Sequence, residues 1–200
     1  MRKMIIVVGG KNDNFFFMGE NKTKFFCNDD PDNFYYNEMC GYKFALDNFE
    51  KLKDEPYIGL EHYRRAFDCT DKEIREILES FDVIVKNEHG PYGKETNLSV
   101  LASCSRYGIS YVEQAKRWVW MFPELREQAE RRKHWGCNML VAKPQKFKEM
   151  LEDEFGYIEQ MMKAPNLQRG AISYFCETIL TPYIVRKHCR KILIGKVKMP

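Results

Sequence analysis

The sequence predicts a single α/β domain over residues 1–200, a Rossmann-like fold in which helices flank a central mixed, mostly parallel sheet. Short continuous runs of apolar, mostly β-branched residues recur along the chain, as in strands that are buried on both faces. Segments with apolar residues at helical spacing lie between these runs. With 44% hydrophobic residues in 200, the chain can bury one substantial core.

Charge and cysteine content narrow the class of protein. The 32 basic and 29 acidic residues leave a net charge of +3, too small and too evenly mixed for a nucleic-acid-binding protein. Seven widely spread cysteines without a CxxC pair argue against a zinc ribbon and against a disulfide framework. The apolar runs are too short for a signal peptide or a membrane span. We therefore expect a cytoplasmic protein whose preference for anions is local.

The first predicted strand, Met4 to Val8, ends in Gly9 and Gly10. Ligands of open α/β sheets bind beyond the carboxyl ends of such strands, so this turn and Lys11 are candidates for contact with a nucleotide. A glycine pair needed only for the turn is the alternative. Neither GxGxxG nor GxxxxGK[ST] occurs, so we expect no dinucleotide site, no P-loop and no organic cofactor. Residues 11–33 follow as a long polar loop.

A helix is predicted over residues 35–52, with Asn33 as its N-cap. Glu38 lies near its start, where a carboxylate either complements the helix dipole or contacts ribose or sugar hydroxyls. Pro56 ends this segment and leads into a predicted strand, Tyr57 to Leu60.

Polar side chains gather where this second strand ends, in the sequence Glu61-His62-Tyr63-Arg64-Arg65. A guanidinium group presents a fork of donors that matches the paired oxygens of a phosphate. Imidazole and carboxylate groups hold a divalent metal or move a proton. His62, Arg64 and Arg65 are therefore candidates for an anion site. The alternative is that the arginines are solvated and the histidine is a hydrogen-bonded filler.

The remaining segments complete the alternation of helices and strands. Strands are expected at residues 81–85 and 137–143, and helices at 71–78, 97–107, 110–122, 124–133, 147–162 and 172–180. Asn138, one residue into its strand, is costly unless hydrogen-bonded, so it either supports the sheet end or touches a ligand. The basic tail, residues 186–191, lies across a diphosphate, contacts an acidic membrane surface or is simply solvated.

Five motifs occur in order: Tyr36-Asn37-Glu38-Met39-Cys40, residues 57–67, Val83-Ile84-Val85-Lys86, residues 137–143, and Arg169-Gly170 before Phe175-Cys176-Glu177. The series resembles a family of small bacterial and viral proteins found with capsular and surface-polysaccharide genes and regarded as glycosyltransferases. The resemblance extends from the first strand to about Tyr183. Its specific part is the His-Tyr-Arg-Arg element with the strand before it.

The resemblance implies a GT-A-like fold and transfer of a hexosyl or deoxyhexosyl group from a nucleotide sugar to a glycan or other hydroxyl acceptor. UDP-sugar is the expected donor, in the cytoplasm, or in the host cytoplasm for a viral protein. Val8, Gly9 and Gly10 would then lie under the base and ribose, and Glu38 near hydroxyl groups. The diphosphate would meet His62, Arg64 and Arg65, and the transferred sugar would meet Asn138.

The resemblance also raises the question of a metal. Gly59 and Glu61 stand where many metal-dependent glycosyltransferases carry Asp-x-Asp, so one carboxylate ligand is absent. Either Glu61 and His62 hold Mn²⁺ or Mg²⁺ with help from elsewhere, or the two arginines neutralise the diphosphate without metal. Glu177 stands at the family's carboxylate position on the late helix. It is either the base for an acceptor hydroxyl or a brace paired with an arginine.

Two other functions stay open. The absent Asp-x-Asp favours a non-catalytic nucleotide-sugar-binding or scaffold module of a larger transferase. A nucleotidyl- or phosphotransferase would use Lys11 and the arginines to grip a triphosphate.

Overall fold

The computed structural model describes residues 4–27, 39–86, 88–89, 95–103, 108–135, 138–165, 167 and 171–200. Of the residues named above, Asn33, Tyr36, Asn37, Glu38, Arg169 and Gly170 lie outside these ranges.

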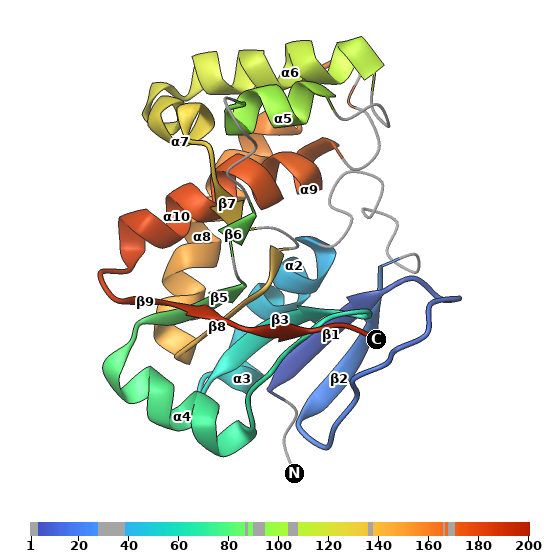
Figure 1. Cartoon of the computed structure of the whole chain (residues 1–200), viewed down its shortest axis with the longest axis vertical. Coiled ribbons are helices and arrows are strands. Elements are labelled where there is room, and N and C mark those ends of the chain that lie inside the picture. The colour runs from blue at the N-terminus through green and yellow to red at the C-terminus, as the bar shows by residue number, and fades with distance from the viewer. Residues whose placement is uncertain are drawn as a thin grey trace.

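A six-stranded sheet in the order β2-β1-β3-β8-β5-β9 forms the centre of the fold (Figure 1). Five of these strands run parallel to one another, and β8 alone runs antiparallel to its two neighbours. This arrangement confirms the predicted fold class. The strands are β1 (Ile5–Gly9), β2 (Lys22–Phe26), β3 (Ile58–His62), β5 (Val83–Lys86), β8 (Leu140–Ala142) and β9 (Ile192–Gly195).

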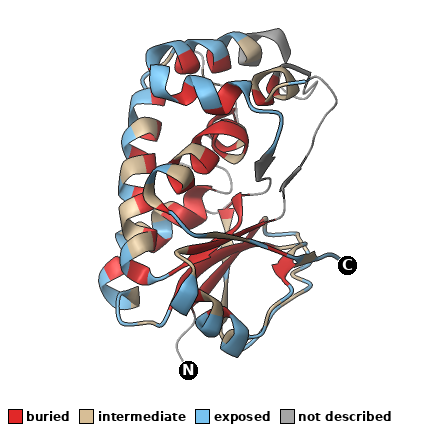
Figure 2. Ribbon diagram, turned by 60° about the vertical axis from the view of Figure 1, so that its left-hand side comes forward, coloured by how far each residue is buried: buried red, intermediate tan, exposed pale blue. Residues whose placement is uncertain are grey.

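Both faces of the inner part of the sheet are covered, and its inner strands β1, β3, β8 and β5 are buried along their whole length. Successive side chains of a strand point to opposite faces. Ile5 and Val7 of β1 pack in a smaller core with α4 (Asp71–Ser80), whereas Ile6 and Val8 belong to the main core. The side chain of Thr70 caps α4, and Glu73 completes a capping box. Figure 2 shows the sheet as a buried layer between helices.

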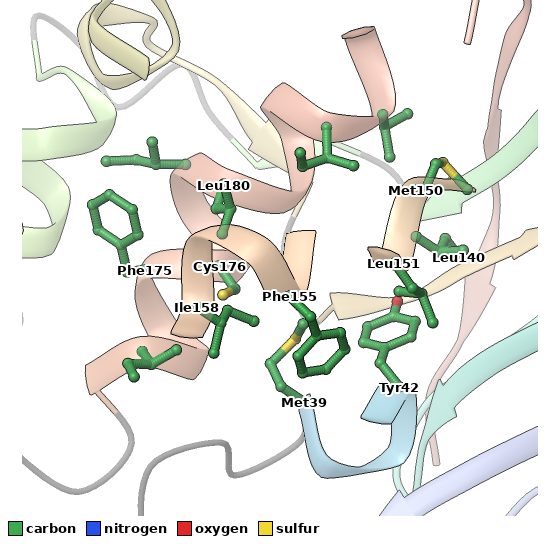
Figure 3. Packing of buried hydrophobic residues seen from close by; sticks show 14 of the residues in the cluster. Met39, Tyr42, Leu140, Met150, Leu151, Phe155, Ile158, Phe175, Cys176 and Leu180 are labelled. Carbon is green, nitrogen blue, oxygen red and sulfur yellow. The ribbon is translucent and has the colours of Figure 1, made fainter. Parts of the chain in front are cut away.

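The main core lies between the sheet and the helices of the other face. Tyr42 of α2 and Leu151 of α8 meet Leu140 there, and Ile158 meets Cys176 (Figure 3). The helices of this side are α2 (Met39–Asp47), α3 (Phe49–Leu52), α8 (Pro144–Met161), α9 (Ala171–Phe175), the π-helical η4 (Cys176–Leu180) and α10 (Thr181–His188). Beyond them lie α5 (Asn97–Ser103), α6 (Gly108–Met121), η2 (Pro123–Leu125) and α7 (Arg126–Glu130) (Figure 1).

Two short ribbons sit beside the main sheet. β4 (Ala66–Phe67) pairs with β10 (Val197–Lys198), and β6 (Glu88–His89) pairs with β7 (His134–Trp135). Among the described residues, no helix combines the length and apolarity needed to cross a bilayer.

The structure corrects two elements of the prediction. Strand β2 lies inside the segment expected to be a loop, residues 11–33, and β9 follows the basic tail, where no strand was expected. The tail itself forms the end of α10 and the turn before β9. Lys187 and His188 both contact Asp153, and Asp82 accepts hydrogen bonds from the backbone N–H groups of residues 190 and 191. Because Asp82 directly precedes β5, the tail lies at the amino ends of the parallel strands.

Candidate functional site at the strand ends

Three predicted site segments lie at one edge of the sheet. Val8 of β1 is paired with His62 of the parallel strand β3, so these two strands end side by side. Leu60 of β3 is paired with Leu140 of the antiparallel strand β8. Asn138 therefore enters β8 at the same edge where β1 and β3 end. The structure thus brings together the turns that follow Val8 and His62 and the residue that begins β8.

The turn after β1 is fixed by its own hydrogen bonds. The backbone N–H of Gly10 donates to Asp13 Oδ2 at 2.6 Å, and the N–H of Asp13 donates back to the Gly10 carbonyl at 3.0 Å. The side chain of Val8 is buried in the core, and its carbonyl accepts the N–H of Tyr63 at 2.9 Å. Val8 therefore contributes a backbone position to this edge, not an exposed side chain.

The second turn contains His62, Tyr63, Arg64 and Arg65. The N–H of Arg65 donates to the carbonyl of His62 at 2.9 Å, which closes a tight turn between β3 and β4. The His62 ring is largely buried and lies 4.4 Å from the Tyr63 ring, centroid to centroid. Arg64 is exposed and Arg65 is half-buried. The turn therefore presents its two guanidinium-bearing residues beside a packed imidazole.

Two cations at this edge lie over a pair of aromatic rings. Phe15 and Tyr63 have ring centroids 6.4 Å apart. The ammonium group of Lys24 lies 5.0 Å from the Phe15 ring, and the guanidinium carbon of Arg64 lies 5.0 Å from the Tyr63 ring. Such contacts hold a cation in place by the ring quadrupole while leaving N–H groups for another partner. Both cations are exposed, so this edge offers positive charge to an anionic ligand.

Lys24, Phe15 and Tyr63 were not among the predicted site residues. Lys24 belongs to the strand that the sequence did not reveal. The available signal was the run of aromatic residues in a polar setting, Phe15 to Phe17, which is typical of ligand walls as well as of core.

Glu61 occupies a different environment from His62. One carboxylate oxygen of Glu61 accepts from Lys22 Nζ at 2.5 Å, and the other accepts the backbone N–H of Phe67 at 2.9 Å. The side chain is 1% exposed, and burial raises the pKa of its carboxyl group, while Lys22 acts in the opposite direction. Because the two residues are consecutive in β3, their side chains point to opposite faces of the sheet.

This geometry does not fit the expectation that Glu61 and His62 share one divalent cation. Ligands of one ion must converge, and these two side chains diverge, with both oxygens of Glu61 already hydrogen-bonded. Within the described ranges, no three His, Cys, Asp or Glu side chains come together as a metal site. Glu61 serves instead as a buried brace between β2, β3 and β4.

Asn138 is buried and makes several hydrogen bonds within the protein. Its φ angle of 43° lies in the left-handed region, which Asn tolerates better than most residues. Its side-chain amide donates to the Ser173 carbonyl at 3.2 Å, its side-chain oxygen accepts from the Thr181 hydroxyl at 3.4 Å, and its backbone carbonyl accepts from Tyr42 Oη at 2.7 Å. With only 2% of its surface exposed, Asn138 supports the sheet end, the first of its two predicted roles.

Glu177 lies in η4, the π-helical segment between α9 and α10, and is half-buried. π-Helical turns are rare and often occur at functional sites. This segment packs against β7, whose partner β6 follows directly after β5. Glu177 thus belongs to the same side of the molecule as the carboxyl ends of the parallel strands.

A known protein family matches most of this chain. Residues 4–188 match the family described as a domain of unknown function, DUF4422. The chain belongs to this family. No protein of curated function matches it.

Among solved structures, the fold is similar to that of a protein described as the WbbM bifunctional glycosyltransferase, in its apo form. The TM-score is 0.72 at 14% sequence identity, and the similarity covers all of this chain and 45% of that protein. This DUF4422 chain therefore spans less than half of that protein's length. At this identity the likeness concerns the fold alone. The His-Tyr-Arg-Arg assignment made from sequence stays a prediction.

Proposed function

We propose that this chain is a glycosyltransferase that moves a sugar from a nucleotide-sugar donor to a hydroxyl group of a glycan or other acceptor. The observation that carries the proposal is the meeting of two turns, Gly9–Gly10 and His62–Arg65, at the ends of neighbouring parallel strands. Ligands of open α/β sheets bind outside such strand ends. The similarity in fold to a glycosyltransferase supports the same class of reaction.

The proposed donor is a uridine nucleotide sugar. Its base and ribose lie against the backbone from Val8 to Gly10, and its diphosphate meets Arg64 and Arg65. Glycosyl transfer builds negative charge on the departing diphosphate, and preorganised cations stabilise that charge in the transition state. Guanidinium groups suit this task because they donate paired hydrogen bonds to phosphate oxygens. Lys24 adds a third positive charge at the same edge.

The remaining predicted residues take supporting or catalytic roles. We assign the charge compensation to the arginines, because the positions of Glu61 and His62 do not suit one shared Mn²⁺ or Mg²⁺ ion. His62 packs under the turn and fixes Tyr63. Asn138 shapes the edge near the transferred sugar through its backbone. Glu177 is the proposed base for the acceptor hydroxyl, and Glu38 the proposed contact to donor hydroxyl groups.

A non-catalytic nucleotide-sugar-binding module is the second candidate. The observation in its favour is that Glu61, the residue at the expected metal-binding position, is engaged with Lys22 on the other face of the sheet. In such a module the cationic edge binds the nucleotide without turnover.

Incubation with UDP-glucose, UDP-galactose and UDP-N-acetylglucosamine separates these functions. Slow release of free sugar, together with binding of UDP, is the result expected of a transferase. Binding of UDP with no sugar released indicates the module. Release of pyrophosphate from a nucleoside triphosphate and a sugar phosphate indicates nucleotidyl transfer and contradicts both candidates.

A further inference from the structure

A cavity lies on the face of the sheet opposite to the side chain of His62. Its volume is about 360 Å³, and it is enclosed by the loop of residues 16–21, strands β1 and β3, the start of α4 and the terminal strand β10. We call it the loop pocket. It is separate from the proposed donor site, although Phe16, on its rim, donates its backbone N–H to the Tyr63 carbonyl at 3.2 Å.

Polar groups of the loop pocket are held in two hydrogen-bonded networks. In one, Glu61 accepts from Lys22 and from the backbone of Phe67. In the other, Asn21 donates to the hydroxyl of Tyr57 at 2.9 Å, and that hydroxyl donates to Asp71 Oδ1 at 2.6 Å. A carboxylate offers about four lone-pair positions. Glu61 is only 1% exposed and Asp71 is also paired with Arg75 at 2.8 Å, so the polar groups within reach of a ligand are those of the half-buried residues Asn21, Lys22 and Asp71.

The charges that line the loop pocket cancel. Lys22 and Lys198 contribute two positive charges and Glu61 and Asp71 two negative charges, and both carboxylates are already paired, Glu61 with Lys22 and Asp71 with Arg75. A phosphate or nucleotide would need an excess of cations, as at the Arg64 edge. An apolar ligand would displace water from these polar groups without replacing its hydrogen bonds, at a cost in desolvation. The lining therefore suits an uncharged ligand with many hydroxyl groups.

One wall of the loop pocket is aromatic. Phe16 is 51% exposed and Phe17 lies beside it, with ring centroids 6.5 Å apart and the ammonium group of Lys198 over the Phe17 ring at 5.6 Å. The negative face of an aromatic ring attracts the weakly positive C–H groups of a sugar ring. Ligand pockets span about 300–1,000 Å³, so this cavity suits one or two sugar units.

We propose that the loop pocket binds an uncharged saccharide of one or two units, with the sugar ring against Phe16 and its hydroxyl groups on Asn21, Lys22 and Asp71. The site is distinct from the donor site because none of Gly9, Gly10, Arg64 and Arg65 lines the loop pocket. Because the rim residue Phe16 is hydrogen-bonded to Tyr63, a saccharide held here also steadies the turn that carries Arg64.

Saturation-transfer difference NMR tests this site with glucose, galactose, N-acetylglucosamine and maltose at millimolar concentration. We expect magnetisation transfer to the ring C–H protons of at least one of these sugars. Phe16→Ala should reduce that signal at least fivefold. Phe44→Ala is the matched control, because Phe44 is 38% exposed on α2 and does not line the pocket. This control should keep the signal.

Saturating UDP separates this proposal from the proposed function. The saccharide signal should persist with UDP bound, and loss of the signal on adding UDP would mean that the sugar occupies the nucleotide site instead. Absence of signal for all four sugars would overturn the loop-pocket proposal while leaving the donor site untouched. Tighter binding of glucose 6-phosphate than of glucose would contradict the argument from charge.

Discussion

Gly9 and Tyr63 approach so closely that a β-carbon on Gly9 would lie 2.8 Å from the Cβ of Tyr63 and 2.9 Å from the Phe15 ring. Heavy atoms in van der Waals contact stay farther apart. The absence of a side chain at Gly9 therefore lets the turn that carries Arg64 lie directly against the end of β1.

Gly9→Ala should displace this turn. Overpacking of this kind costs about 1–3 kcal/mol, and the displaced turn should also weaken the binding of UDP. Gly156→Ala is the control, since nothing lies within 4 Å of a β-carbon there and Gly156 is exposed within α8. The control should raise helix stability by about 0.5–1 kcal/mol. Denaturant unfolding measures the stability of both variants. Equal stability of Gly9→Ala and wild type would contradict the steric role assigned to Gly9.

Asn138 combines a left-handed backbone with three hydrogen bonds, so two substitutions separate these contributions. Asn138→Gly relieves the backbone but loses the side-chain hydrogen bonds, whereas Asn138→Ala loses both advantages. We expect both variants to be less stable than wild type. The alanine variant should be less stable than the glycine variant by about 1–2 kcal/mol. Thermal unfolding gives the order. An alanine variant as stable as the glycine variant would remove the role assigned to the φ angle.

Substitutions in the Lys22–Glu61 pair distinguish a structural role of Glu61 from a role as a metal ligand. Glu61→Ala leaves a buried ammonium group without its partner and should cost about 3–5 kcal/mol of unfolding free energy. The double variant Lys22→Met with Glu61→Leu removes both charges and should recover most of that loss. If Glu61→Ala instead keeps wild-type stability and loses only Mn²⁺-stimulated turnover, Glu61 is a metal ligand.

The buried carboxyl group of Glu154 should make the free energy of unfolding depend on pH. It is buried, accepts a hydrogen bond from Thr181 at 2.5 Å, and has its pKa raised to about 7 by burial. The pKa of Glu is about 4.3 in an unfolded chain, so the folded state holds this proton more tightly. The free energy of unfolding should therefore fall as pH rises between these two values, by on the order of 3 kcal/mol.

Glu154→Gln should abolish that part of the pH dependence. Denaturant unfolding at several pH values across this window measures the slope. Glu152→Gln, at an exposed position of the same helix, is the control and should keep the wild-type slope. A Glu154→Gln variant with the wild-type slope would mean that Glu154 does not hold a proton in the folded protein.

The sequence predicted those strands that are buried on both faces, which are continuous apolar runs. Strand β2, with the sequence Lys-Thr-Lys-Phe-Phe, lies at the sheet edge and is only partly buried, so it carries no such run. Strand β9 lies at the other edge of the sheet. It directly follows a basic segment, so it was not recognised as a strand from the sequence. Edge strands have one neighbour and one wet side, which leaves their pattern weak.

The same limit applies to the residues of the candidate site. Polar residues at the end of a buried strand, such as His62 and Arg64, could be proposed as site candidates because the end of a strand is visible in sequence. The contacts of Lys24 with Phe15 and of Phe15 with Tyr63 join segments that are distant along the chain, and no local pattern reports them. The divergence of Glu61 and His62 follows from strand alternation once β3 is known to extend through both residues.

The central claim is that Arg64 binds the donor diphosphate, and calorimetric titration with UDP tests it most directly. Arg64→Ala should weaken UDP binding at least about tenfold, or about 1.4 kcal/mol, with the melting temperature unchanged. Arg126→Ala, at an exposed position of α7, should bind UDP like wild type. Equal affinity of wild type and Arg64→Ala for UDP would contradict the account.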